Sequence, residues 1–196
     1  MLHLSDIPLF KLLKTGQTTQ YGGYNDDGLY EMGIAKAYTV LTLGVYSGHT
    51  HIILNAIDEA HDNACVYDRR TQLMWSRYLP HHVGPNVNGS LPWTTNVNGE
   101  GIFAYVAAAN AALLAGYGDW RVCNMTEMLS LFDIEAPNAY PDVVAFPNHQ
   151  VDLQYWTSTT RPDTVTNAFW VQHVYPYTYF DLKTLNTFFL MLVRGG

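Results

Sequence analysis

The chain has 196 residues, which is enough to bury the core of one domain, and its formal net charge is −7. Charged residues make up only 14% of it, against about 25% in typical soluble domains, whereas fourteen residues are tyrosine. The acidic balance excludes binding to phosphate backbones, and no stretch reaches the ~18 apolar residues of a membrane-spanning helix, so we expect neither a nucleic-acid partner nor membrane insertion.

The N-terminal segment has no basic region before its apolar residues, and Asp6 and Pro8 interrupt those residues, so we predict no signal peptide. Cys65 and Cys123 are the only cysteines, which excludes a disulfide framework. One disulfide between the two cysteines is an alternative, but two buried free thiols are the favoured interpretation. We therefore expect the chain to be made and folded in a cytoplasm. This expectation is compatible with a protein that acts outside the cell, for example on a virus particle released by lysis.

The first part of the chain predicts short strands separated by turns. Residues 4–13 form either a short helix or an edge strand. Asp26 and Asp27 mark a turn, because their oxygens lack the regular spacing of a calcium-binding loop. His49 and His51 would share a strand face, but no cysteine or carboxylate stands at ligand spacing nearby, so exposed strand residues are favoured over a metal site. Strands are predicted over 37–45, 51–57 and within 62–75, the last with Arg69 and Arg70 at its turn.

Residues 79–101 predict a long inserted loop that contains three prolines and two Asn-Gly turn signals. Loops beyond ~15 residues are uncommon in compact domains and are often functional. The two Asn-Gly turns favour a hairpin within the loop. No linker divides the chain there, so we predict a single domain over 1–196.

Two helices are predicted after the loop. The first, 103–114, has an apolar stripe of 3.6-residue period, and Gly116 and Gly118 can take the positive φ values that end it. The stripe consists of Phe103, Val106, Ala107, Asn110, Leu113 and Leu114. The second helix, 125–132, begins with a capping box formed by Asn124 and Glu127. Between the helices we expect Trp120 to be buried and Arg121 to pair with a nearby carboxylate or carbonyl.

The last part of the chain reads as strands and turns. Strands are predicted over 155–159, 168–175, 179–182 and 188–194. Two helices followed by a terminal antiparallel sheet, with long loops between the elements, predict an α+β fold.

Five ordered blocks carry a family resemblance. The most specific are GYGDWR at 116–121, YWTSTT at 155–160 and LVRGG at 192–196, preceded by KTGQT with DDG at 14–28 and by VYDRRTQLMW at 66–75. Together they resemble the C-terminal domain of Lcl-type collagen-like adhesins. The chain departs from the family pattern at Cys123, Gln72 and Met191, where the family has Pro, Gly and often Arg.

The resemblance implies a C-type-lectin-like fold in which the N- and C-terminal strands pair with each other. It also implies structural roles for a set of eight residues: Asp119, Trp120, Arg121, Asn124, Glu127, Trp156, Trp170 and Arg194. The calcium-ligand motifs of sugar-binding C-type lectins do not occur, and neither do the paired cysteines of the related formylglycine-generating enzymes. We therefore expect no metal and no cofactor.

The segment 161–187 predicts a ligand-binding surface. Tyr175, Tyr177 and Tyr179 alternate, so an extended chain places them on one face, as in an antibody-type paratope. Pro176 removes a ladder donor, so the segment is expected at a sheet edge or in a loop. The candidate binding residues are Arg161, Asp163, Asn167, His173, Tyr175, Tyr177, Tyr179, Asp181 and Asn186, with Thr187 beside them. Of these, His173, Tyr175, Tyr177, Tyr179 and Asp181 are expected to be exposed together.

Domains that resemble this one include the variable proteins of diversity-generating retroelements, in which adenine-directed mutagenesis rewrites codons near the end of the gene. The candidate residues all belong to the set that such mutagenesis of an Asn codon permits. The resemblance thus implies a binding module, not an enzyme, that recognises a protein or glycan on a host surface for a virus or phage. The alternatives are an undiversified adhesin-type or structural domain of the same fold and, less favoured, an enzyme that uses Cys65 or Cys123 with a distant histidine.

Overall fold

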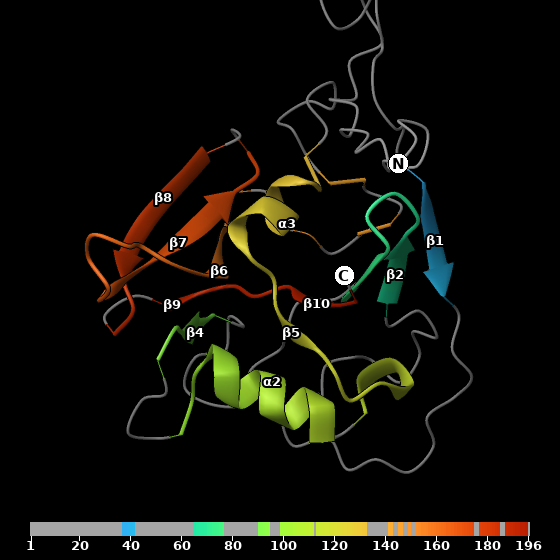
Figure 1. The fold of residues 1–196 in the computed structure, drawn as a ribbon, viewed down its shortest axis with the longest axis horizontal. Coiled ribbons are helices and arrows are strands. Elements are labelled where there is room, and N and C mark those ends of the chain that lie inside the picture. Colours follow the sequence, from blue (N-terminus) through green and yellow to red (C-terminus); the bar gives the residue numbers. More distant parts are fainter. Residues whose placement is uncertain are drawn as a thin grey trace, which may run out of the picture.

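The computed structural model describes residues 37–41, 65–76, 90–94, 99–111, 113–132, 141–142, 145–146, 149, 152–174, 177–184 and 187–195. Their elements are β1 (Tyr38–Leu41), β2 (Cys65–Asp68), β3 (Leu73–Ser76), β4 (Leu91–Pro92), α2 (Ile102–Ala111), the 3₁₀ turn η2 (Leu114–Gly116), β5 (Arg121–Val122), α3 (Met125–Leu129), β6 (Gln154–Thr160), β7 (Asn167–Gln172), β8 (Tyr177–Leu182), β9 (Thr187–Phe188) and β10 (Leu192–Arg194). Helices and antiparallel sheets in one arrangement make this an α+β fold, as predicted (Figure 1).

A five-stranded sheet in the order β1-β2-β3-β10-β5 forms the centre of the described structure. β2 and β3 form a hairpin whose turn contains Arg69 and Arg70, as predicted. The last strand, β10, pairs antiparallel with β3 on one edge and with β5 on the other. Both edges of β10 are therefore occupied, by β3 and β5. The expected pairing of the N- and C-terminal strands involves a segment that the structure does not describe. The residues predicted for that segment, 4–13, lie outside the described part of the chain.

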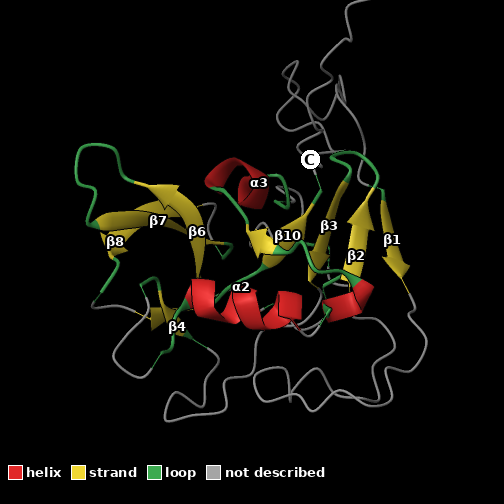
Figure 2. Cartoon of the chain, turned by 60° about the horizontal axis from the view of Figure 1, so that its bottom comes forward, coloured by secondary structure: helices red, strands yellow, loops and turns green. Residues whose placement is uncertain are grey.

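The two faces of the central sheet are buried in two separate apolar clusters. Along 188–193, the even-numbered side chains belong to the cluster that contains α2, and the odd-numbered ones belong to the cluster that contains α3. β2 and β3 alternate in the same way, because side chains two residues apart share one face of a strand. The two helices accordingly lie on opposite sides of β10 (Figure 2). Met191, an apolar residue where the family often has Arg, is buried within the α3 cluster.

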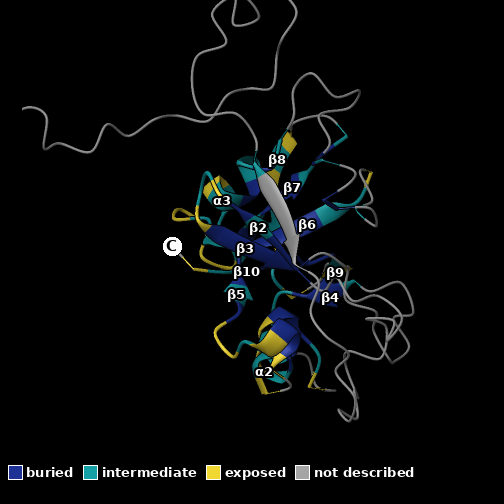
Figure 3. Cartoon of the chain, turned by 90° about the vertical axis from the view of Figure 1, so that its right-hand side faces the viewer, coloured by how far each residue is buried: buried dark blue, intermediate teal, exposed yellow. Residues whose placement is uncertain are grey.

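Helix α2 packs on the sheet through Ile102, Tyr105 and Ala109, which are its buried residues (Figure 3). The predicted apolar stripe does not coincide with the buried side of α2, since Phe103 and Ala107 are exposed. Every residue of α2 except Asn110 is apolar or Tyr, and it carries no charged residue. A helix that is apolar on all sides contains no sequence signal for the side that faces the core.

The end of α2 also differs from the prediction. The helix stops at Ala111, earlier than 114, and Leu113 then takes a left-handed conformation with φ of 51°. Ala115 and Gly116 follow with φ of 52° and 84°. The turn is thus built largely from left-handed residues other than glycine, and Trp120 Nε1 bonds to the Leu114 carbonyl at 2.8 Å within it.

The capping box of α3 is confirmed. Asn124 Oδ1 accepts the Glu127 N–H at 2.9 Å, and Glu127 Oε2 accepts the Asn124 N–H at 2.8 Å. Arg121 donates to both carboxylate oxygens of Glu127, at 2.8 and 2.6 Å, and to the carbonyl of Gly195 at 3.0 Å. The helix itself is shorter than predicted and ends at Leu129. One Arg therefore joins the start of α3 to the end of the chain.

Three further predictions for framework residues are confirmed. Trp120 is 2% exposed and Trp156 and Trp170 are buried. Arg194 pairs with Asp119 through bonds of 2.6 and 3.0 Å, and its guanidinium lies 3.7 Å from the centre of the Tyr117 ring. The GYGDWR block and the terminal Arg are thus neighbours in space, which explains why both belong to the same sequence pattern.

Two smaller sheets complete the described fold. β6, β7 and β8 form an antiparallel sheet in that order, close to the predicted strand positions. β4 pairs with β9, Leu91 facing Phe188. The predicted loop 79–101 therefore contains a short strand paired far along the chain, and α2 begins directly after it at Ile102. The predicted hairpin across its Asn-Gly turns falls on residues outside the described part, as does the predicted strand 51–57.

Candidate functional site

The clearest exposed aromatic surface of the described structure lies on the outer strand β8. By register, Tyr177, Tyr179 and Asp181 project from one face of this strand. Tyr177 and Tyr179 are each 47% exposed, and their rings stack with centroids 6.0 Å apart at an angle of 11°. Asp181 is half-buried, and its Oδ1 accepts the N–H of Leu182 at 2.9 Å. Among the described strands, β8 lies at the edge of its sheet, as predicted.

The tyrosine pair rests on a buried aromatic layer. Trp170 faces Tyr179 across the β7–β8 register and is 7% exposed. Its ring centroid lies 5.6 Å from that of Tyr177 and 6.2 Å from that of Tyr179. Phe188 then continues the layer, at 5.5 Å from Trp170 and 4.5 Å from Trp156. The exposed rings are therefore held by contacts that reach into the core.

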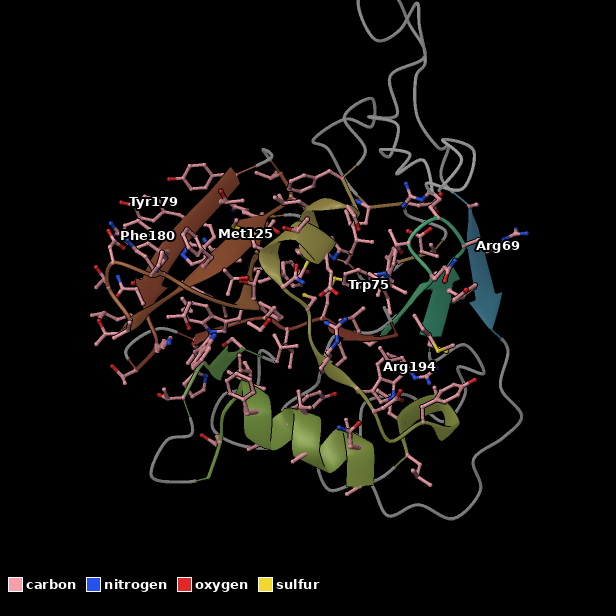
Figure 4. The ribbon with its side chains drawn as sticks, viewed as in Figure 1. Arg69, Trp75, Met125, Tyr179, Phe180 and Arg194 are labelled. Atoms are coloured by element: carbon pink, nitrogen blue, oxygen red, sulfur yellow. The ribbon has the colours of Figure 1, made fainter. Side chains whose placement is uncertain are left out.

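A cation–π contact lies beside the tyrosines. The Arg161 guanidinium sits 3.6 Å from the centre of the Phe180 ring. It also forms a forked ion pair with Asp163, Nε to Oδ1 at 2.5 Å and Nη2 to Oδ2 at 2.7 Å. The hydrogen bonds of this pair raise the pKa of Arg161 and lower that of Asp163. Figure 4 shows Tyr179 and Phe180 together on the β8 side of the molecule, far from Trp75 and Arg194.

Phe180 was missed by sequence reasoning. It lies between Tyr179 and Asp181, and the alternation that selected those residues assigned Phe180 to the opposite face. Arg161 belongs to the turn between β6 and β7, so the cation–π contact with Phe180 depends on the pairing of β7 with β8.

Lys183 forms a second cation–π contact at the end of β8. Its Nζ lies 4.0 Å from the centre of the Trp93 ring and donates to Thr160 Oγ1 at 2.8 Å. Trp93 in turn donates its Nε1–H to the Thr157 carbonyl at 2.9 Å and meets Phe103 edge to face at 4.7 Å. Desolvation lowers the pKa of Lys183. This contact was also missed, because Trp93 lies in the predicted loop and reaches Lys183 only through tertiary structure.

His173 is not part of the surface, and its predicted exposure was wrong. It is 0% exposed, and its Nδ1 lies 2.9 Å from Nε2 of His149. Its ring meets Phe132 edge to face at 4.7 Å and Tyr155 at 5.7 Å. Burial lowers the pKa of His149 to about 3 and lowers that of His173 well below its usual value. Alternation counted from the tyrosines misplaced it because β7 ends at Gln172, and the chain turns before β8 begins.

Of the remaining candidate residues, the structure describes Asn167 and Thr187 but not the other two. Asn167 is half-buried and shapes the turn before β7, its carbonyl accepting the Arg161 N–H at 2.9 Å and its N–H donating to the Thr164 carbonyl at 2.8 Å. Thr187 is exposed and its hydroxyl contacts Ser90. Tyr175 and Asn186 lie outside the described residues. Arg161, Asp163, Tyr177, Tyr179 and Asp181 are therefore the candidates that the structure gathers around β8.

Both cysteines are free and buried, which confirms the preferred prediction. They lie in different apolar clusters, Cys65 with α2 and Cys123 with α3, so they face opposite sides of the sheet. Burial raises the pKa of Cys65 to about 11 and also raises that of Cys123. Thiols with raised pKa values are poor nucleophiles at neutral pH.

Within the described ranges, no group of three or more His, Cys, Asp or Glu side chains is arranged to hold a metal ion. The residues weighed as metal ligands from the sequence, Asp26, Asp27, His49 and His51, lie outside those ranges. Among the described helices, none is long and apolar enough to cross a membrane.

Comparison with known proteins identifies the family. Searches of curated proteins and of solved structures return no match. The model of the Lcl C-terminal domain matches residues 64–194, which is well over half of the chain. The match includes both β2–β3 and the GYGDWR block, and it ends at Arg194, the partner of Asp119. The chain therefore belongs to the Lcl C-terminal domain family.

Proposed function

We propose that this domain is a C-type-lectin-like binding module whose recognition surface is centred on β8. The observation that carries the proposal is the stacked, half-exposed pair of Tyr177 and Tyr179 on an edge strand, backed by the buried Trp170. Rigid tyrosines offer a large contact area for little loss of rotamer entropy, which is why antibody paratopes use them. A binding role, and not catalysis, is the function that this arrangement supports.

We further propose that the surface is diversified. The turn before β7 is closed by main-chain bonds, from the Thr164 N–H to the Arg161 carbonyl at 3.3 Å and from the Asn167 N–H to the Thr164 carbonyl at 2.8 Å. Main-chain bonds survive side-chain replacement. Substitutions at exposed sites change stability by only about ±0.5 kcal/mol in most cases. The scaffold is thus suited to vary its surface without losing its fold.

The role would then be that of a variable protein of a diversity-generating retroelement, used by a virus or phage to recognise a protein or glycan on a host surface. Family membership and the permitted residue types in 161–187 support this role. The alternative is an undiversified adhesin-type or structural domain of the same fold. The DNA separates the two: a diversified gene has a near-copy of the codons for 155–196 beside a reverse-transcriptase gene.

A pair of displayed libraries tests the binding surface. One library randomises Arg161, Asp163, Tyr177, Tyr179 and Asp181, and a matched control library randomises Tyr155, Trp156, Thr157, Trp170 and His173. We expect most clones of the first to resist protease and some to bind an immobilised model protein such as lysozyme. Most clones of the second are expected to be cleaved, because each of those five positions is buried. Equal protease sensitivity in the two libraries would reject the proposed surface.

A further inference from the structure

β8 has a free edge within the described structure. It pairs with β7 on one side, and no described strand pairs with it on the other, where Figure 1 places it at the outside of the molecule. The Lys183 N–H donates to the Thr166 carbonyl, which makes residue 183 a hydrogen-bonded position of the ladder. Because such positions alternate, Tyr177, Tyr179 and Asp181 turn their main chain toward β7, and Thr178, Phe180 and Leu182 turn theirs outward.

The edge is limited at both ends. The outward N–H of Leu182 is already bonded to Asp181 Oδ1 at 2.9 Å. At the other end stands Pro176, which has no N–H to donate. Natural edge strands are commonly protected by charges or prolines within the strand. Between these limits the five residues Tyr177 to Asp181 contain one charge, at the very end, so Thr178 and Phe180 present unprotected main-chain groups.

We propose that β8 pairs antiparallel with β8 of a second copy of this chain, about a two-fold axis at Tyr179. In this register Thr178 exchanges main-chain hydrogen bonds with Phe180 of the second copy, and Phe180 with its Thr178. Tyr179 faces Tyr179, and Tyr177 faces Asp181, so the carboxylate lies opposite a neutral phenol and no like charges oppose each other. Aromatic cross-strand pairs of this kind stabilise antiparallel sheets.

The two neighbouring registers would need main-chain donors that are already bonded or absent, which makes the pairing at Tyr179 specific. An axis at Phe180 would require the N–H of Leu182, which Asp181 already binds. An axis at Thr178 would require a main-chain donor at Pro176, which has none. The Tyr179 axis is the register that uses all the outward groups of Thr178 and Phe180 and no blocked donor. It also keeps the tyrosine side chains on the open face of the joined sheet, so that the dimer would present two Tyr177–Tyr179 pairs side by side. The main-chain pairing of Thr178 with Phe180 does not require a diversified gene, whereas the choice of register rests on Tyr179, Asp181 and Pro176 as they stand in this chain.

Disulfide trapping tests the register directly. A non-hydrogen-bonded antiparallel pair brings its Cα atoms to ~4.5 Å, which lies within the range that a disulfide accepts. Tyr179→Cys should therefore form a covalent dimer under mild oxidation on a non-reducing gel. Tyr177→Cys is the matched control and should stay monomeric, because its partner position is Asp181. The native Cys65 and Cys123 are buried and leave the background clean. Equal cross-linking of the two variants, or none in Tyr179→Cys, would overturn the proposed register.

Sedimentation of the unmodified chain supplies the second measurement. We expect a concentration-dependent dimer that Thr178→Pro abolishes, because proline removes an outward N–H, and that Thr178→Val retains. Melting curves of all three proteins separate loss of pairing from loss of folding. A wild-type chain that stays monomeric overturns the proposal and leaves the edge to an extended segment of another protein. A dimer that Thr178→Pro leaves intact, in a variant that is folded, places the interface elsewhere and also overturns it.

Discussion

Asn110 makes a two-way hydrogen bond with the main chain of Trp120. Its Oδ1 accepts the Trp120 N–H at 2.7 Å, and its Nδ2 donates to the Trp120 carbonyl at 2.9 Å. One side chain of α2 thus satisfies both main-chain groups of the residue that precedes β5, as a neighbouring strand would. Asn110 is the single strongly polar residue of α2, and this contact explains its presence in an otherwise apolar helix.

Asn110→Ala should destabilise the domain by about 2–3 kcal/mol, since it removes two hydrogen bonds worth about 1 kcal/mol each and leaves partly buried main-chain groups unpaired. Urea unfolding at neutral pH measures the loss. Ala107→Ser, at an exposed position of the same helix, is the control and should change stability by no more than about 0.5 kcal/mol. Equal stability of the two variants would show that water replaces the Asn110 contacts at no cost.

Gln72→Gly should stabilise the domain. Gln72 closes the β2–β3 turn with φ of 60°, in the left-handed region, where a residue with a side chain loses roughly 1–2 kcal/mol. Glycine removes that strain and adds some unfolded-state entropy, so we expect a net gain of about 0.5–1 kcal/mol. Arg69→Gly, in the same turn but without a positive φ, should lower stability. A loss of stability in Gln72→Gly would mean that the turn is not strained.

The capping box gives a graded prediction. Asn124→Ala should cost about 1 kcal/mol, the usual value for a lost N-cap. Glu127→Ala should cost more, because it removes the reciprocal capping bond and both bonds from Arg121. Chemical denaturation of the two variants checks the order. Thr126→Ala, exposed in the same turn, serves as the control. Neither substitution should affect the binding proposed for the β8 surface, and the reverse order of cost would contradict the role of Arg121.

The His149–His173 pair predicts a loss of stability in acid. Both pKa values are lowered in the folded state, that of His149 to about 3, whereas unfolded histidine titrates near 6.5. Above pH ~6.5 both states are neutral and the pair has no pH dependence. Below pH ~6.5 both histidines bind protons in the unfolded chain, whereas they stay neutral in the folded chain. The free energy of unfolding should then fall by about 1.4 kcal/mol per pH unit for each histidine.

Urea unfolding at several values between about pH 7 and pH 5 measures this slope. His149→Gln is the matched variant, because it keeps a side chain that can hydrogen bond to His173 but does not titrate. We expect it to reduce the acid slope by about half. An unchanged slope in His149→Gln would assign the acid sensitivity to other groups.

The local features of this chain could be predicted because their causes are local. The capping box of Asn124 and Glu127 lies within one helical turn, and its geometry follows from residue types three positions apart. The alternation of Tyr177 and Tyr179 predicted a shared face because the strand repeat is two residues. The burial of Trp120 and the pairing of Arg121 were also predicted, because burial stabilises a large apolar ring and a carboxylate stabilises a guanidinium.

Tertiary structure decided everything that depends on a distant partner. A period shows that a helix or strand has two faces but does not show which one meets the core, so α2 buries Tyr105 and exposes Phe103 against expectation. His173 is buried because His149, Phe132 and Tyr155 surround it, and none of them is adjacent in sequence. In the same way, Leu91 pairs with Phe188 and Lys183 contacts Trp93, although the partners are separated by almost half of the chain. The sequence by itself determined most of the described elements and the capped start of α3, because their causes are local. Long-range packing determined where α2 ends and which surfaces stay exposed.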